Sequence, residues 1–195
     1  FLTGYSQQMD YRKLLAAPVN LREKMIQLIR REAEIARNGK PAHIIIKINS
    51  LTDIETIHEL YKASQAGVKI DLIIRGICML RPGIQGISDN IRVVSVVGRF
   101  LEHSRIFYFA NGGEEEIYIG SADLMQRNLN RRVEVIVPIK NREFLKYLKE
   151  DILAAYLQDN INAQILQTDG SYEKVNPLSE DDTFDSQMYF VGMDF

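Results

Sequence analysis

A chain of 195 residues, 46% of them hydrophobic and 26% charged, with a net charge of −2, can bury a core without metals or disulfides. The nearly neutral charge argues against a general binder of nucleic acid or anionic membranes, but it allows a local basic patch. The single cysteine, Cys78, excludes a disulfide within the chain and favours a reducing, cytoplasmic compartment. No apolar run approaches the roughly 20 residues of a membrane span.

The first half of the chain predicts a helix followed by a β-α-β unit. Residues 1–19 are irregular, and we expect them to form a linker that enters the domain. The segment 21–39 has apolar residues at helical spacing and predicts an amphipathic helix of about 17 residues. The run AHIIIKIN (42–49) is typical of a strand buried on both faces. A helix capped by Thr52 or Asp53 and a strand at 68–76 follow, which predicts parallel strands.

The second half predicts several more strands, at 90–98, 105–111, 115–122, 131–139 and 161–168. The turn Asn111-Gly112-Gly113 predicts an antiparallel hairpin. A polar crossover lies at 123–131. A helix capped by Asn141 has one apolar face, made by Phe144, Leu148, Ile152 and Tyr156.

This order of elements predicts an α/β fold, an α/β/α sandwich around a mixed β-sheet. We expect residues 20–168 to form this domain. Residues 169–195 contain an acidic cluster and aromatic residues with little regularity. We expect them to form an irregular tail, either a strap or a disordered end.

The stretch 98–123 contains the residues that best fit phosphate chemistry. His103 has Arg99 and Arg105 nearby, and on a strand residues 103 and 105 share a face. A neutral imidazole can act as a nucleophile or general base toward phosphorus. The spacing alone leaves a purely structural histidine equally open. His43 and His58 are interpreted as structural or surface residues.

Further basic residues lie near the expected ligand edge of the sheet. Arg75 ends a buried strand, and ligands of open α/β sheets bind outside the carboxyl ends of strands. It could clamp phosphate or form a salt bridge at the rim. Arg127, Arg131 and Arg132 follow the sequence GSAD and could equally form a solvated face. Ser121 and Asp123 could bind phosphate, orient a base or cap the next segment.

The motifs that contain these residues resemble a known family. The runs IDLIIRGICMLRPGIQGISDNIRVVSVVGRFLEHSRIFYFANGG and YIGSADLMQRNLNRRVEVIVPI resemble the C-terminal domain of bacterial polyphosphate kinase of the histidine-phosphorylating type. The resemblance covers most of the chain and implies one half of a phospholipase-D-like fold, with Arg105 where phospholipases have lysine.

The resemblance implies reversible transfer of the terminal phosphate of ATP to polyphosphate, with Mg²⁺. His103 matches a histidine, and Arg75 an arginine, that contact the ATP phosphates. Arg132 matches a further basic residue, and Arg105 is expected to bind phosphate with them. The phosphorylated histidine, the adenine contacts and the Mg²⁺-linked residues match segments that precede this chain. We therefore expect a fragment that is inactive alone.

The implied partners are ATP or ADP, polyphosphate and the N-terminal domains of the same enzyme. A homo-oligomer is expected, without nucleic acid, and peripheral membrane association of the full enzyme is compatible with the family. Two alternatives stay open. One is a phospholipase-D-like phosphodiesterase or nuclease half completed by dimerisation, against which Arg105 and Asp123 argue because lysine and asparagine are usual there. The other is a non-catalytic module for polyanion binding or oligomerisation.

Overall fold

The structure is a computed structural model that describes residues 13–193. Residues 1–12 of the linker expected at 1–19 therefore lie outside the described residues. The expectation is wrong for Leu15–Ala17, which form a buried strand of the sheet. The strands are β1 (Leu15–Ala17), β2 (His43–Ile48), β3 (Lys69–Ile74), β4 (Ile91–Val96), β5 (Arg105–Phe109), β6 (Glu116–Gly120), β7 (Glu134–Ile139), β8 (Ala163–Leu166) and β9 (Tyr172–Lys174). The α-helices are α1 (Leu21–Arg37), α2 (Ile54–Gln65), α3 (Gln126–Asn130), α4 (Arg142–Tyr147), α5 (Ala154–Gln158) and α6 (Ser186–Val191). A π-helical segment, Leu148–Leu153, joins α4 to α5.

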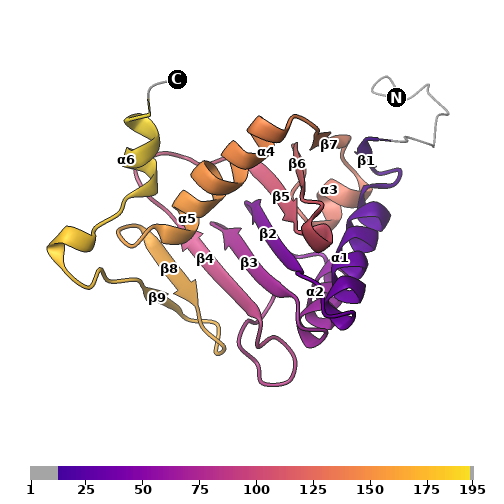
Figure 1. The fold of residues 1–195 in the computed structure, drawn as a ribbon, viewed down its shortest axis with the longest axis horizontal. Coiled ribbons are helices and arrows are strands. Elements are labelled where there is room, and N and C mark those ends of the chain that lie inside the picture. The colour runs from indigo at the N-terminus through magenta and orange to yellow at the C-terminus, as the bar shows by residue number, and fades with distance from the viewer. Residues whose placement is uncertain (1–12, 194–195) are drawn as a thin grey trace.

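One mixed sheet organises the molecule, with the strand order β1-β7-β6-β5-β2-β3-β4-β8-β9. The central strands β2, β3 and β4 are parallel, and the other pairs are antiparallel. Helices α1 and α2 cover one face, and α4 and α5 cross the other (Figure 1). The predicted α/β/α sandwich, its β-α-β unit and its antiparallel hairpin are confirmed.

Apolar residues at helical spacing hold α1 against the sheet, and the carboxylate of Asp53 joins α1 to α2. Leu21, Met25 and Ile29 recur every four residues along α1, and all three are buried against the sheet. Asp53, one of the two predicted caps, accepts a hydrogen bond from the backbone nitrogen of Thr56 at 3.2 Å. The same carboxylate pairs with Arg22 of α1 at 2.9 Å. A helix cap therefore also joins the two helices.

The helical layer on the opposite face differs in one respect from the prediction. Asn141 caps α4 as expected, accepting from the backbone nitrogens of Glu143 and Phe144 at 2.8 and 3.1 Å. However, the Phe144 side chain is 61% exposed, and Leu145 is buried in its place. The prediction that Phe144 shares one face with Leu148, Ile152 and Tyr156 is therefore wrong, because those three pack on the core and Phe144 does not. Apolar periodicity assumes one α-helical register, whereas this helix contains a π-helical segment.

The last part of the chain is more regular than the sequence suggested. Strand β9 pairs with β8 at the edge of the sheet, and α6 is capped by Asp185. Helix α6 is also held by Asp159, which accepts from the Ser186 backbone nitrogen at 2.9 Å and hydroxyl at 2.7 Å. The expectation of an irregular tail is wrong for these two elements. The contact that holds α6 comes from Asp159, which is distant in the sequence, whereas β9 forms a hairpin with the preceding strand β8.

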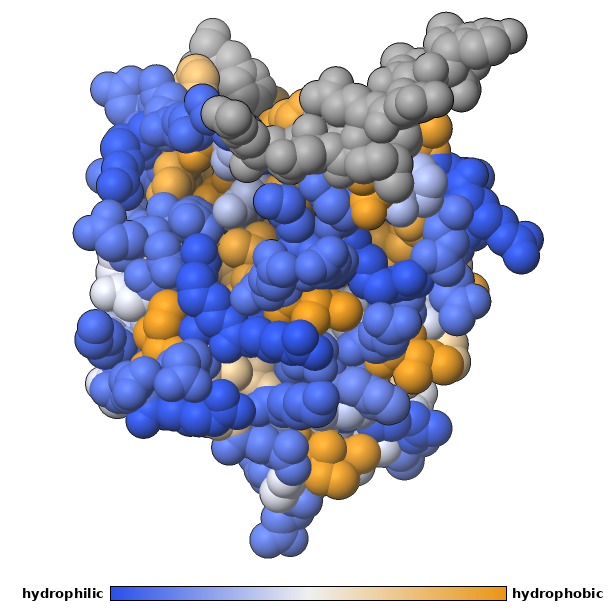
Figure 2. Space-filling model, turned by 90° about the vertical axis from the view of Figure 1, so that its right-hand side faces the viewer, coloured by the Kyte–Doolittle hydropathy of each residue, from blue (hydrophilic) through white to orange (hydrophobic). Residues whose placement is uncertain are grey.

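The surface on the side of α1 is mainly hydrophilic, with apolar side chains scattered over it (Figure 2). Within residues 13–193, no helix is both long and apolar enough to cross a membrane.

Candidate phosphate-binding site

Four chain segments meet at the edge of the sheet formed by the carboxyl ends of its central parallel strands. Parallel strands β2 and β3 end there, followed by Asn49 and Arg75. Because β5 and β6 are antiparallel to each other, β5 begins at this edge with Arg105, and β6 ends there just before Asp123. The carboxyl ends of central parallel strands are the usual ligand position in such sheets.

The carboxylate of Asp123 is the centre of this edge. Asp123 is only 4% exposed. It accepts from Arg105 Nη2 at 3.1 Å and Nε at 3.3 Å, and from the backbone nitrogen of Asn49 at 2.7 Å. Burial disfavours the charged carboxylate, but the hydrogen bonds from Arg105 and Asn49 outweigh it and lower the pKa of Asp123. Asp123 thus stays ionised and fixes two of its neighbours.

Arg105 connects this carboxylate to His103. The guanidinium is in a residue only 8% exposed, and its Nη1 lies 2.9 Å from His103 Nδ1, 3.4 Å from Nε2, and 2.8 Å from the His103 carbonyl oxygen. A guanidinium only donates, so in this contact the imidazole accepts, and Nδ1 is the nearer of its two nitrogens. His103 itself is exposed. Its ring is therefore oriented by Arg105, while the residue stays accessible to solvent.

Arg75 joins the same network through Asn49. Its Nε donates to Asn49 Oδ1 at 2.7 Å, and Asn49 also contacts Asp123. Among residues 13–193 no carboxylate pairs with Arg75, so the salt bridge considered for it from the sequence does not form. Arg75 is half-buried. Its remaining N–H groups and its charge are available to an anion.

The other basic residues are not part of this network. Arg132 is exposed just before β7, and no side-chain hydrogen bond or ion pair connects it to the described residues. Arg99 lies over the Phe100 ring, 5.4 Å from its centroid. Arg127 and Arg131 line a separate cavity of about 520 Å³. The structure therefore links His103, Arg75 and Arg105, but does not join Arg132 to them.

The residues of the sequence GSAD have mainly structural roles. The Ser121 hydroxyl donates to Glu134 and is not free for phosphate. A side chain on Gly120 would lie 2.3 Å from the carbonyl oxygen of Val135, so only glycine permits the close approach of β7. This turn fixes the position at which Asp123 enters the network.

Two site residues were missed by sequence reasoning, Asn49 and Lys47. Lys47 is buried, and its Nζ lies 3.5 Å from Glu102 Oε2 and 4.4 Å from the centroid of the Tyr156 ring. Burial lowers the pKa of Lys47, and the positive charges of Arg75 and Arg105 lower it further. The Glu102 carboxylate acts in the opposite direction and raises the pKa, but by less than burial lowers it. A single lysine in the apolar run AHIIIKIN was the available signal.

The acidic groups here do not fit a metal site. Asp123 is occupied by Arg105 and Asn49, and Glu102 by Lys47 and other donors. No group of three or more His, Cys, Asp or Glu residues between 13 and 193 is arranged to hold a metal ion. These carboxylates therefore serve to hold cationic and amide groups of the chain.

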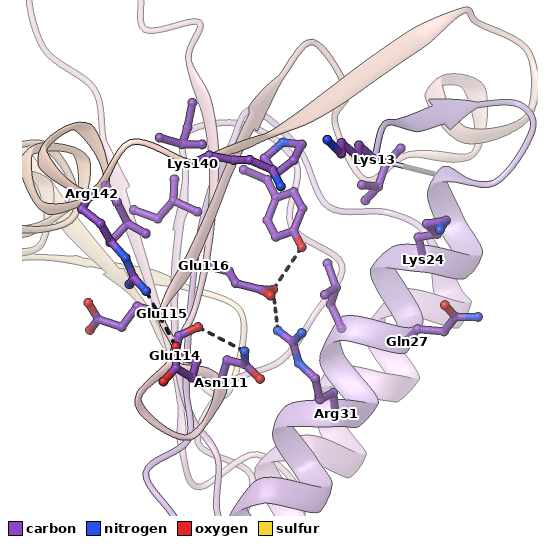
Figure 3. A pocket seen from close by; sticks show the side chains of 17 residues that line it. Lys13, Lys24, Gln27, Arg31, Asn111, Glu114, Glu115, Glu116, Lys140 and Arg142 are labelled. Carbon is purple, nitrogen blue, oxygen red and sulfur yellow. Dashed lines mark hydrogen bonds and ion pairs between the residues drawn. The ribbon is translucent and has the colours of Figure 1, made fainter. Parts of the chain in front are cut away.

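A cavity of about 680 Å³ lies at the opposite ends of β6 and β7 (Figure 3). Three glutamates, Glu114, Glu115 and Glu116, lie among its basic side chains, and Arg31 pairs with Glu116 at 2.7 Å. Its lining shares no residue with the Asp123 network. Its mixed charge makes it a poorer anion site than the edge with Arg75 and His103.

Cys78 does not contribute a nucleophile. Burial raises the pKa of its thiol to about 11, so the reactive thiolate is scarce at neutral pH. This agrees with the sequence interpretation of an inert cysteine.

Fold and site together define a phospholipase-D-like α/β domain with a cationic edge. The Salmonella typhimurium phospholipase D family member Nuc has a TM-score of 0.58 over 80% of this chain and 97% of its own, at 14% identity, which shows the shared fold alone. The family model described as polyphosphate kinase C-terminal domain 2 matches residues 14–187. The chain therefore belongs to the polyphosphate kinase family.

Individual relatives agree with this assignment. A polyphosphate kinase from Synechocystis is 58% identical over 192 residues, which is 98% of this chain and 26% of that protein. The crystal structure of polyphosphate kinase from Porphyromonas gingivalis has a TM-score of 0.89 at 38% identity, covering 98% of this chain and 30% of its own. The chain thus spans about a quarter of the length of the curated relative.

Proposed function

We propose that this chain supplies the C-terminal part of the active site of an ATP:polyphosphate phosphotransferase. The reaction would transfer the terminal phosphate of ATP to polyphosphate, reversibly, through a phosphohistidine outside this chain. The observation that supports this most directly is the network from Arg75 through Asn49, Asp123 and Arg105 to His103. It places a guanidinium that has no carboxylate partner among residues 13–193, and one oriented imidazole, at the same edge of the sheet.

The proposed roles follow from the requirements of phosphoryl transfer. The transferred group spreads negative charge over its oxygens, so catalysis depends on positioning and charge neutralisation. Arg75 would neutralise a phosphate oxygen with its free N–H groups. His103 would contact a second oxygen through its imidazole ring. Arg105 would act by holding His103, and by adding positive charge.

Arg132 has a more peripheral role in this proposal. It is exposed and uncommitted, so it would contact phosphates of the longer polyanion. Mg²⁺ would arrive with the nucleotide. The cytoplasmic location, the homo-oligomer and the membrane association expected from the resemblance remain predictions, as does the division at 20–168 and 169–195.

The test uses the full-length protein that contains this sequence. Arg75→Ala and His103→Ala should each lower ATP-dependent polyphosphate synthesis and the reverse phosphorylation of ADP by at least about 100-fold, since each removes a charge-stabilising donor. Arg127→Ala, an arginine outside the network, is the matched control and should retain activity. Full activity in both variants would contradict the proposed site. Hydrolysis of a phosphodiester without ATP would favour the phosphodiesterase alternative instead.

A further inference from the structure

The loop between β4 and β5, residues 97–104, contains His103 but has no regular structure of its own. Its side chains are largely exposed, with Leu101 at 79%. Such a loop loses considerable entropy when one conformation is fixed. Contacts from elsewhere in the molecule must therefore hold it if His103 is to have a defined position.

Gln187 of α6 provides such contacts. Gln187 is only 3% exposed. The backbone nitrogen of Phe100 donates to Gln187 Oε1 at 2.8 Å, and Gln187 Nε2 donates to the Phe100 carbonyl oxygen at 2.8 Å. One amide side chain thus satisfies both backbone groups of Phe100, as a neighbouring strand would.

The close approach of Gln187 requires a glycine in the loop. A side chain on Gly98 would place its Cβ 2.6 Å from Gln187 Oε1, which is closer than real contacts allow. Loop and helix therefore fit each other at two separate points, Gly98 and Phe100. Both belong to the run VVGRFLEHSRI (96–106), which also contains His103.

Glu102, directly before His103, forms the second part of this attachment. Its Oε1 accepts from Gln187 Nε2 at 3.0 Å. Its Oε2 accepts from the Tyr156 hydroxyl and lies 3.5 Å from Lys47 Nζ. Side chains from β2, α5 and α6 thus converge on one carboxylate. The buried Lys47 has its partner here.

Helix α6 is itself fixed to the domain. The ring of Phe190 packs on Tyr156, with centroids 5.1 Å apart, and Asp159 holds Ser186. The helix follows β9 in the chain and lies beside α5, near the end of the described chain (Figure 1). A C-terminal element is thus joined through Gln187 to the loop that contains His103.

We propose that Gln187 is a positioning residue, through which α6 holds the 97–104 loop and so places His103 for phosphoryl transfer. Arg105 fixes the ring of His103 from one side. Gln187, acting on Phe100 and Glu102, fixes the backbone that leads to it from the other side. This inference rests on the proposed function of His103.

The test compares Gln187→Ala with Met188→Ala in the full-length protein that contains this sequence. Met188 is the adjacent, exposed residue of α6. Hydrogen exchange of the 97–104 segment measures the contact, and kcat and KM for ATP measure the positioning. Loss of hydrogen bonds of ordinary strength should speed exchange of the Phe100 amide by about tenfold or more in Gln187→Ala only.

The kinetic result separates positioning from simple stabilisation. The kcat of Gln187→Ala should fall about tenfold with little change in the KM for ATP, because a misplaced donor acts in the transition state. Its melting temperature should fall by only a few degrees, as expected for a domain of this size. Gly98→Ala should give the same pattern, since it displaces Gln187 without altering it.

Each failure has a distinct meaning. Unchanged exchange in Gln187→Ala would overturn the contact. Faster exchange with an unchanged kcat would overturn the positioning role. A wild-type protein without phosphoryl transfer would overturn the proposed function, and the exchange result would still decide whether Gln187 holds the loop.

Discussion

At the scale of single residues, Asp123 is the group on which the proposed site depends. Its two oxygens are shared between Arg105 and Asn49, and it is buried. Asp123→Asn removes the charge while keeping the shape. We expect the free energy of unfolding at pH 7 to fall by about 3 kcal/mol, because Arg105 would be left buried without its partner. Urea denaturation measures this.

The pH dependence of stability gives a second test of the Asp123 prediction. The lowered pKa of Asp123 means that its contribution to stability is complete above the pKa of an unfolded aspartate, about 4, and is lost as the pH falls below it. The difference between wild type and Asp123→Asn should therefore shrink in acid. Equal stability of the two proteins at pH 7 would show that the Arg105 pair contributes nothing net.

Residue spacing predicted part of this site. His103 and Arg105 were placed together as alternate residues of a strand. They do contact each other, but His103 lies in the loop before β5, and the Arg105 side chain reaches back to it. Arg75 was placed by its position at a strand end. Asn49 and Lys47 could not be assigned, because their roles depend on Asp123 and Glu102, which are far away in the sequence. Such pairings exist only once the strand order is known.

At the scale of elements, Asp71 ties three parallel strands together at the edge opposite the proposed site. This buried carboxylate of β3 pairs with His43 of β2 at 2.8 Å and Arg92 of β4 at 2.8 Å. Burial opposes ionisation, but the His43 hydrogen bond and the Arg92 charge outweigh it and lower the pKa of Asp71 to about 2. His43 is thus structural, as interpreted from the sequence.

A pH-dependent stability follows from the lowered pKa of Asp71. The stabilisation is complete above pH 4 and is lost between about pH 4 and 2, as Asp71 protonates in the folded state. Asp71→Asn should therefore cost about 2 kcal/mol at pH 7 and much less at pH 2.5. Urea titrations at the two pH values test this, with the exposed Asp181→Asn as control. A constant difference at both values would contradict it.

Most elements were predictable because their patterns are local. The β-branched run at β2, the Asp53 and Asn141 caps and the Asn111-Gly112-Gly113 turn depend on neighbouring residues. Helix α6 depends instead on Asp159, far away in the sequence, and the exposed three-residue strand β9 depends on its pairing with β8. Local composition therefore indicated an irregular tail where tertiary contacts produce two regular elements.

At the scale of the whole molecule, the network around Asp123 is one side of a site. It provides donors and positive charge for an anion, but His103 already has Nδ1 engaged by Arg105. In the proposed function the nucleophilic histidine comes from elsewhere in the enzyme. This chain would then bind phosphate without transferring it.

The 195-residue chain alone should therefore bind tripolyphosphate weakly and show no ATP-dependent polyphosphate synthesis above background. Binding should weaken with salt, since the exposed Arg132 and the half-buried Arg75 supply part of the attraction. Calorimetric titration at two ionic strengths measures binding, and ³²P transfer from ATP measures activity. Arg75→Ala should weaken binding about tenfold, as expected for one charged hydrogen bond. Synthesis of polyphosphate by the chain alone, abolished by His103→Ala, would instead mean that His103 performs the covalent step itself.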